Sequence, residues 1–154
     1  MGRVVLLLLV CQTALPVLAQ DCRKLLGHQS ADTASLKRVE DDWDEAFLHG
    51  KSEYIQCLLL PDYISVSAKG EHDKAWEIEH ARKNKGSSAP VPSFPGMIFT
   101  IHGNTAIARL FKPASADGKQ PASYAADVFA FQDGAWRAVY SQHTDVRADN
   151  QGGL

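Results

Sequence analysis

Residues 123–132 read SYAADVFAFQ and residues 135–145 read AWRAVYSQHTD, with Asp133 and Gly134 between them. Aromatic and β-branched residues run through both stretches, as they do in β-strands. An Asp-Gly pair between two such stretches is the strongest short-range signal for a β-hairpin with a two-residue turn. The stretch therefore predicts an antiparallel hairpin near the carboxyl end of the chain.

This hairpin distributes its side chains over two faces, because side chains alternate along a strand. A two-residue turn predicts four pairs on one face: Phe131 with Trp136, Phe129 with Ala138, Asp127 with Tyr140, and Ala125 with Gln142. An aromatic wall with Asp127, Tyr140 and Gln142 at one end fits a pocket that is mostly apolar and has a few convergent polar groups.

A second hairpin is predicted upstream. Residues 97–102 and 105–112 flank Gly103 and Asn104, a pair that suits another two-residue turn. The pairing collects six apolar side chains on one face, which we expect to face the core: Met97, Phe99, Ile101, Ala106, Ala108 and Leu110.

Helices are predicted before these strands. Residues 30–49 carry an apolar stripe at helical spacing, and their charged residues, Glu40 and Asp44 among them, are assigned to the opposite face. Shorter helices are predicted at 52–60 and 73–83, with a strand at 63–68 that ends before Gly70. Helices followed by mostly antiparallel strands indicate an α+β fold, a curved sheet with helices on one face.

The first 19 residues have the order of a signal peptide. Arg3 precedes the apolar run VVLLLLV at 4–10, and Val17 and Ala19 suit the −3 and −1 positions of a cleavage site. The run is shorter than the roughly 20 residues that a membrane-spanning helix needs. We expect cleavage after Ala19 and a secreted or periplasmic protein, with no membrane contact after cleavage. The division expected is 1–19 signal peptide, 20–29 N-terminal extension, 30–146 α+β domain and 147–154 loose tail.

The composition of the chain bears on two questions: whether it binds nucleic acid, and whether its cysteines form a disulfide. The chain has 16 Lys and Arg against 18 Asp and Glu, a balance that does not suggest a nucleic-acid partner. Cleavage would remove Cys11 and leave Cys22 and Cys57. In an oxidising compartment these two could form a disulfide, or Cys57 could remain a buried free thiol. The sequence leaves both possibilities open.

The chain resembles the nuclear-transport-factor-two-like superfamily, in its SnoaL-like and ketosteroid-isomerase-like group, over about residues 36–145. The resemblance rests on these motifs: Trp43-x-x-Ala46 before Gly50, Leu59-x-Pro61-Asp62-Tyr63, Gly103-Asn104-Thr105-Ala106, Ala126-Asp127-Val128-Phe129, and Asp133-Gly134-Ala135-Trp136-Arg137. It implies a cone-shaped, mostly antiparallel sheet with three helices on its concave face. It also implies a homodimer formed through the sheet. Members range from isomerases to binding proteins without catalysis, so the resemblance implies no single activity.

Two functions from different classes follow. The first is a domain that binds a small hydrophobic molecule. The residues expected to line its pocket are Trp43, Phe47, Tyr63, Trp76, Phe129 and Gln142. The second is an isomerase-like or dehydratase-like enzyme, in which Asp127 moves a proton and the Tyr140 hydroxyl stabilises an enolate oxygen. In a third, structural interpretation, Asp127 only satisfies a hydrogen bond within the sheet.

The predicted helices also carry histidines and carboxylates that are candidates for catalysis or metal binding. His80 shares a predicted helix face with Trp76 and is a catalytic candidate if that face points inward; an outward face makes it a surface residue. Glu77-x-x-His80 and Glu45-x-x-x-His49 each put two possible ligands on one helix face, but a metal site would need further ligands. We expect no metal and no cofactor.

Overall fold

The computed structural model describes residues 22–94, 96–115 and 121–146, so the predicted signal peptide and the predicted tail at 147–154 lie outside the described residues. Residues 22–26 are helical. The helices that follow are α2 Thr33–Leu48, α3 Ser52–Leu58 and α4 Lys74–Lys83. The strands are β1 Leu59–Ser67, β2 Gly70–Asp73, β3 Ile98–His102, β4 Thr105–Lys112, β5 Ser123–Gln132 and β6 Ala135–Asp145.

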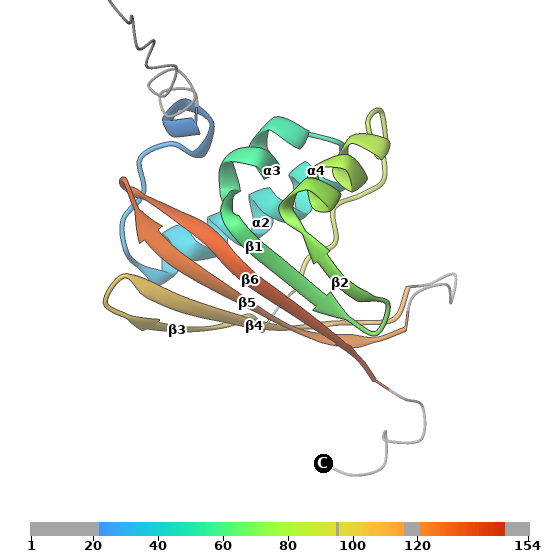
Figure 1. Ribbon diagram of the computed structural model, residues 1–154. Coiled ribbons are helices and arrows are strands. Elements are labelled where there is room, and N and C mark those ends of the chain that lie inside the picture. The colour runs from blue at the N-terminus through green and yellow to red at the C-terminus, as the bar shows by residue number, and fades with distance from the viewer. Residues whose placement is uncertain (1–21, 95, 116–120, 147–154) are drawn as a thin grey trace, which may run out of the picture.

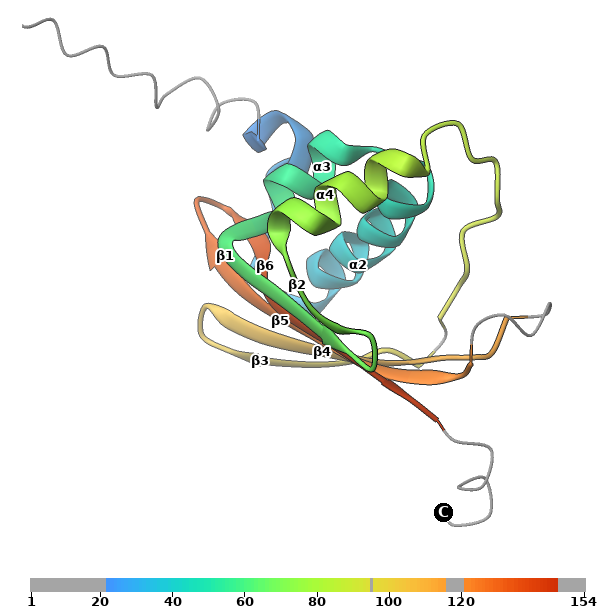
Figure 2. The ribbon, with the colours of Figure 1, turned by 45° about the vertical axis from the view of Figure 1, so that its right-hand side comes forward.

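The strands form one six-stranded sheet in the order β2-β1-β6-β5-β4-β3. Strands β1 and β6 are parallel, and every other neighbouring pair is antiparallel. The sheet is strongly curved and open, and α2, α3 and α4 lie on its concave side (Figures 1 and 2). The predicted α+β fold class is therefore confirmed.

Both predicted hairpins are present. Asp133 and Gly134 have φ values of 54° and 79°, the left-handed backbone that a tight two-residue turn requires, and Gly103 has a φ of 62°. The β3–β4 hairpin also buries the expected face, since Ala106, Ala108 and Leu110 are 3% exposed or less.

The first strand differs from its prediction. It begins directly after α3, at Leu59, and it forms a hairpin with β2, in which Ser67 pairs with Gly70. Strand β2 was missed because its sequence, GEHD, is polar and its residues are mostly exposed at the sheet edge, so it carries no apolar alternation. Gly70 therefore begins a strand rather than ending one.

The core lies between α2 and the concave face of the sheet. The Asp32 side chain caps α2 by accepting a hydrogen bond from the Ser35 amide. The fully buried side chains of Leu36 and Val39 pack in the same cluster as Phe129 and Trp136. Burying a large apolar side chain contributes about 1.5–3 kcal/mol, so this cluster is a main source of stability.

The segment before α2 is tied to the domain at two points. A disulfide joins Cys22 to Cys57, which is one of the two alternatives that the sequence left open. Gln29 accepts a hydrogen bond from the Trp136 amide through its side-chain oxygen and donates from its own amide to the Gly134 carbonyl. Among the described residues, none of the helices has both the length and the apolar character needed to cross a membrane.

Candidate functional site

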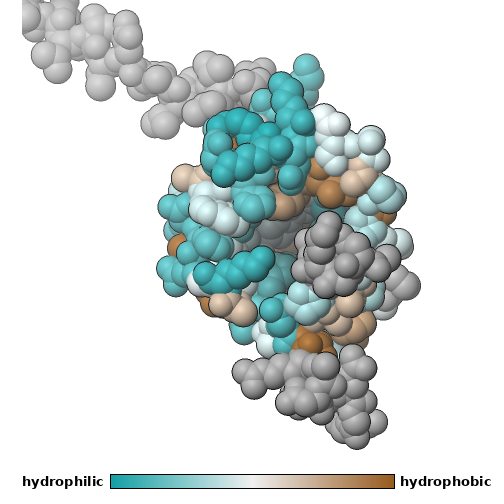
Figure 3. Space-filling model, turned by 90° about the vertical axis from the view of Figure 1, so that its right-hand side faces the viewer, coloured by the Kyte–Doolittle hydropathy of each residue, from teal (hydrophilic) through white to brown (hydrophobic). Residues whose placement is uncertain are grey.

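A cavity of about 160 Å³ lies between the helices and the concave face of the sheet. Its lining combines aromatic and titratable side chains from both layers: Glu40, Trp43, Asp44, Phe47, Tyr63, Glu77, Lys112, Asp127, Ser141 and His143. Four residues of the predicted pocket are among them: Trp43, Phe47, Tyr63 and Asp127. On the side of the molecule where β6 ends, the described surface is mostly hydrophilic, with small hydrophobic patches (Figure 3).

The predicted pairing across the β5–β6 hairpin is correct near the turn and wrong beyond it. Phe131 pairs with Trp136 and Phe129 with Ala138, but Val128 then pairs with Tyr140, because β6 has a bulge between these two pairs. Such a bulge inserts one extra residue, here Val139, and exchanges the two faces of the strand beyond it.

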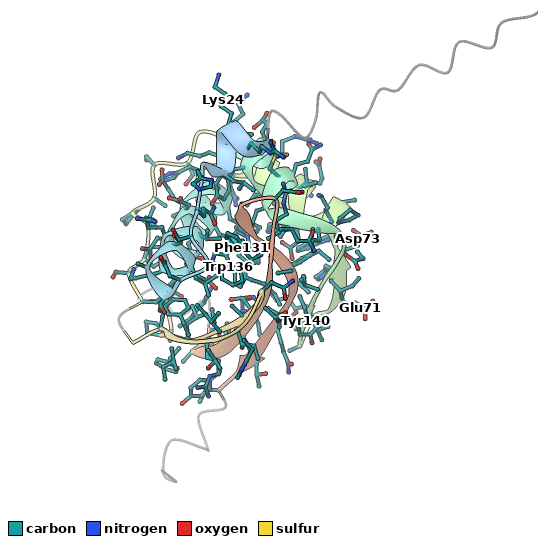
Figure 4. All side chains as sticks on the ribbon, turned by 90° about the vertical axis from the view of Figure 1, so that its left-hand side faces the viewer. Lys24, Glu71, Asp73, Phe131, Trp136 and Tyr140 are labelled. Carbon is teal, nitrogen blue, oxygen red and sulfur yellow. A yellow bond between two sulfur atoms is a disulfide. The ribbon has the colours of Figure 1, made fainter. Side chains whose placement is uncertain are left out.

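The exchange changes which residues reach the cavity. Asp127 faces Ser141 and Ala125 faces His143, in place of Tyr140 and Gln142. Tyr140 lies farther along β6 than the Phe131 and Trp136 pair at the hairpin end (Figure 4), and its hydroxyl is 3.4 Å from the Gln142 side-chain oxygen on the outer face. Neither Tyr140 nor Gln142 lines the cavity.

Asp127 is a buried carboxyl on the sheet side of the cavity. Only 4% of it is exposed, and it accepts a hydrogen bond from the Ser141 hydroxyl. Burial raises the pKa of Asp127 to about 6, although the Ser141 hydrogen bond and the charge of Lys112 act in the opposite direction. A carboxyl with such a pKa exists in both protonation states near neutral pH.

Glu40 was assigned to the wrong face of its helix. It is 3% exposed and lines the cavity, and its Oε1 atom has no hydrogen-bond partner within the described part of the chain. Burial is the main cause that raises the pKa of Glu40 well above its ordinary value, and the charges of Asp127 and Asp44 raise it further. A signal was present: Glu40 follows Leu36 by four positions and precedes Trp43 by three, so it belongs to the apolar stripe.

The remaining polar side chains of the cavity form ion pairs or hydrogen bonds, or are uncharged at neutral pH. Lys112 Nζ lies 3.5 Å from Asp44 Oδ1, and the Ser65 hydroxyl donates to Glu77 Oε1 at 2.7 Å. His143, which the sequence analysis did not assign to the site, has its pKa lowered to about 4, mainly by burial and also by Lys112. It is therefore uncharged at neutral pH.

Aromatic rings form the apolar part of the site. The ring of Trp43 meets those of Tyr63 and Phe129 edge-on, with both centroid distances at 6.0 Å. Phe129 is fully buried beneath Trp43 and is not itself a lining residue. Burial raises the pKa of Tyr63 above its ordinary value, so its hydroxyl remains protonated at neutral pH.

Trp76 and His80 lie outside the cavity, on the exposed face of α4. Trp76 is 40% exposed and stacks between His72 and His80, with centroid distances of 3.7 and 4.5 Å. Both side chains are exposed, and His80 also stacks on the outer side of Phe47 with a centroid distance of 5.4 Å; His80 does not line the cavity, and the structure does not bring it to Asp127. Within the described ranges, no group of three or more His, Cys, Asp or Glu side chains could hold a metal ion.

A larger, open hollow of about 1290 Å³ lies near the disulfide, on the side of the helical segment that carries Lys24 (Figure 4). Two of its three cationic side chains already bond the backbone: Arg137 donates to the Cys57 carbonyl at 2.8 Å and Lys74 to the Gln56 carbonyl at 2.6 Å. These contacts join α3 to β6 and to α4, which is a structural role. The small cavity is therefore the better candidate site.

No family model matches the chain, and no curated protein matches it. Solved structures do. An NTF2-like protein of unknown function from Silicibacter pomeroyi is 12% identical with a TM-score of 0.62, covering 73% of this chain and 94% of its own. An NTF2-like protein from Cytophaga hutchinsonii is 18% identical with a TM-score of 0.59, covering 72% and 95%.

A third solved structure is described as that of a candidate ketosteroid isomerase, from Parabacteroides distasonis. It is 14% identical with a TM-score of 0.56, and the match covers 81% of this chain and 99% of that one. The chain thus has the NTF2-like fold, and the resemblance predicted from its motifs is confirmed at that level. Identities this low show the fold alone.

Proposed function

We propose that this chain is an exported domain that binds a small molecule in the cavity between α2 and the sheet. One observation carries the proposal: a cavity with an aromatic side, formed by Trp43, Phe47 and Tyr63, also holds the buried carboxyls of Asp127 and Glu40. Pockets that bind small molecules combine an apolar wall with a few convergent polar groups in this way.

The cavity volume limits the size of the ligand. It is about 160 Å³, and a cavity of about 150 Å³ accommodates one benzene molecule. A ligand with about one ring therefore fits without rearrangement. Larger, drug-sized ligands occupy pockets of about 300–1,000 Å³ and would require the helices to move away from the sheet.

The enzyme alternative receives less support from the site. An isomerase-like or dehydratase-like mechanism with Asp127 and Tyr140 needs both side chains in one cavity, and Tyr140 is on the outer face of β6. The pKa of about 6 for Asp127 does suit proton transfer. Tyr63 would then have to supply the hydroxyl, so binding without turnover is the simpler proposal.

Two further parts of the proposal concern export and assembly. The disulfide between Cys22 and Cys57 supports export, because disulfides persist in oxidising compartments. The outer sheet face supports a homodimer, since Ile98, Phe111 and Tyr124 are 46–54% exposed there. Sedimentation of the mature chain tests the dimer; a monomer at high micromolar concentration would exclude it. The intact mass of the exported protein tests cleavage after Ala19.

The binding proposal can be tested by NMR on the mature chain, residues 20–154. Toluene, benzyl alcohol and benzylamine each carry one ring and fit the cavity volume. We expect at least one of them to shift the indole N–H signal of Trp43 in a saturable manner. The indole signal of Trp76, which lies on the exposed face of α4, serves as an internal control and should not move. Saturable shifts confined to Trp76 or to the outer hollow, or none with any probe, would refute the proposal.

A further inference from the structure

We infer that the cavity selects a small organic cation, a protonated primary amine attached to an apolar body of about one ring. The inference rests on the proposed function, because it names the ligand class of the same cavity. It starts from the one fully buried carboxyl oxygen of the cavity that the described residues leave without a hydrogen-bond partner, Glu40 Oε1.

The other carboxyls of the cavity are already engaged. Asp127 accepts from Ser141, Glu77 accepts from Ser65, and Asp44 faces Lys112. Glu40 is 3% exposed, so water does not compensate its free oxygen in the way that it does at a surface. A buried hydrogen-bond acceptor without a donor destabilises the folded protein. A ligand that donates an N–H group to Glu40 Oε1 removes this cost, and the free energy gained favours binding.

The charges around the cavity favour a cation over an anion. The titratable or charged groups facing it come from every surrounding element: Glu40 and Asp44 on α2, Tyr63 on β1, Glu77 on α4, Lys112 on β4, Asp127 on β5 and His143 on β6. Lys112 is the only one among them that is cationic at neutral pH, and it already faces Asp44. An anionic ligand would therefore meet three carboxyls that have no cationic partner.

The aromatic side of the cavity suits the rest of such a ligand. Trp43 and Tyr63 meet edge-on, and Phe47 completes the apolar lining. These rings bury an apolar body, and an ammonium group near a ring face gains cation–π attraction. A neutral ring compound would gain the same burial but would leave Glu40 Oε1 without a strong donor.

Proton release accompanies the binding of an ammonium ion. Burial raises the pKa of both Glu40 and Asp127, so the empty cavity holds protons that a nearby positive charge displaces. Binding should therefore tighten as pH rises from about 5 to 8, while the amine remains protonated. The binding enthalpy measured by calorimetry at pH 6 should differ between phosphate and Bis-Tris buffers in the direction of proton release.

The decisive experiment compares four ring compounds of similar size on the mature chain at pH 7.5: benzylamine, benzyl alcohol, toluene and benzoate. We expect benzylamine to bind at least tenfold more tightly than benzyl alcohol, measured from the Trp43 indole shift, and benzoate not to saturate. Equal or tighter binding of benzyl alcohol or toluene would overturn the inference.

Variants assign the preference to Glu40. Glu40→Gln keeps the size of the side chain and removes its charge, so the preference for benzylamine should fall to within about twofold. Glu45→Gln is the matched control on the same helix, because Glu45 faces solvent and pairs with Lys51; the tenfold preference should remain. A tenfold preference that survives Glu40→Gln would contradict the assignment.

The outcomes separate the inference from the proposed function. If benzyl alcohol and toluene shift Trp43 and benzylamine does not, the cavity binds small molecules and the cation class is wrong. If none of the four compounds shifts Trp43, both fail. Should Glu40→Gln not fold, the comparison of the four compounds on the unmodified chain still decides the ligand class.

Discussion

The Ser141 hydroxyl donates a hydrogen bond to Asp127 Oδ1 across the β5–β6 pair, and the contact exists because β6 has one more residue than β5 at Val139. Without that bulge the strand period would bring Tyr140 to the inner face and turn Ser141 outward. A shift of one residue in the pairing of β5 with β6 thus decides whether Asp127 lies opposite the hydroxyl of Ser141 or the phenol of Tyr140.

Replacing Ser141 by alanine should raise the pKa of Asp127 above about 6, because the hydrogen bond that stabilises the carboxylate is lost. We also expect the free energy of unfolding to fall by about 1–2 kcal/mol. Titration of the Asp127 carboxyl carbon by NMR measures the first effect, and urea denaturation the second. Ser123→Ala, at the start of β5, is the control and should leave the Asp127 titration unchanged. An unchanged pKa in Ser141→Ala would show that this hydrogen bond does not stabilise the charge.

Asp127→Asn should change how stability depends on pH. The folded pKa of Asp127 is raised from 3.8 to about 6, so its contribution to stability is complete below pH 3.8 and is lost as pH rises through 6. The unmodified chain should therefore lose up to about 3 kcal/mol relative to Asp127→Asn between pH 4 and pH 7.5. The asparagine oxygen can still accept from Ser141. Urea denaturation at the two pH values measures the difference, and parallel behaviour of the two proteins would contradict it.

The parts of the fold that could be predicted are those with local signals. The turn at Asp133 and Gly134 has its own chemistry, and α2 shows both a cap at Asp32 and a stripe that begins at Leu36. Such features depend on neighbouring residues only. The β3–β4 and β5–β6 hairpins, helices α2, α3 and α4, and the fold class were therefore available from the sequence.

The parts that failed depend on contacts with distant residues. The bulge at Val139 has no marker in the sequence AVY, because it arises where β6 must pair with both β1 and β5. Glu40 was placed outside because a carboxyl at a helix position is usually solvated. Its position in the apolar stripe between Leu36 and Trp43 was a local signal for burial, but the residue type outweighed it. Four of the residues that line the cavity were therefore predicted from the sequence: Trp43, Phe47, Tyr63 and Asp127. The other six were missed: Glu40, Asp44, Glu77, Lys112, Ser141 and His143.

Gly50, which joins α2 to α3, should be the least replaceable glycine of the helical layer. Its φ is +73°, and a Cβ there would overlap the Lys85 backbone and lie 2.9 Å from the Asn84 carbonyl carbon. Gly86 is the matched control, since its φ is +87° and a Cβ meets nothing within 4 Å. Both alanine variants have the cost of left-handed backbone, about 1–2 kcal/mol. Gly50→Ala should lose roughly 1–3 kcal/mol more because of the overlap. Equal losses of unfolding free energy in the two variants would show that the Asn84 and Lys85 backbone after α4 can move to accommodate the added methyl group.

The disulfide between Cys22 and Cys57 should contribute substantially to stability. It joins residues 35 positions apart, and the chain-entropy model gives about 3–4 kcal/mol for a closed loop of that length. The double variant Cys22→Ser with Cys57→Ser should unfold at lower urea by that amount. Reduction of the unmodified chain should give the same midpoint. A loss below about 0.5 kcal/mol would contradict this contribution.

Glu40→Met should stabilise the protein while removing its preference for amines. Methionine has nearly the length of glutamate and no group that needs a hydrogen-bond partner, so it fills the same space beside Trp43. Removing a buried unpartnered acceptor is worth about 1–3 kcal/mol. The raised pKa of Glu40 gives the sign of the pH dependence: its carboxyl costs most when it must ionise, so the gain from Met should be larger at pH 8 than at pH 4.

Urea denaturation at these two pH values measures the gain, and Glu45→Met is the control. Glu45 faces solvent, and its hydrogen bond and ion pair with Lys51 lower its pKa, so no gain that grows with pH is expected there. A loss of stability in Glu40→Met at pH 8 would mean that the Glu40 carboxyl is bonded within the fold. The cavity would then lack the free acceptor on which its selectivity for a cation depends. A gain in stability together with lost benzylamine binding would show that the empty protein retains a destabilising carboxyl for its ligand.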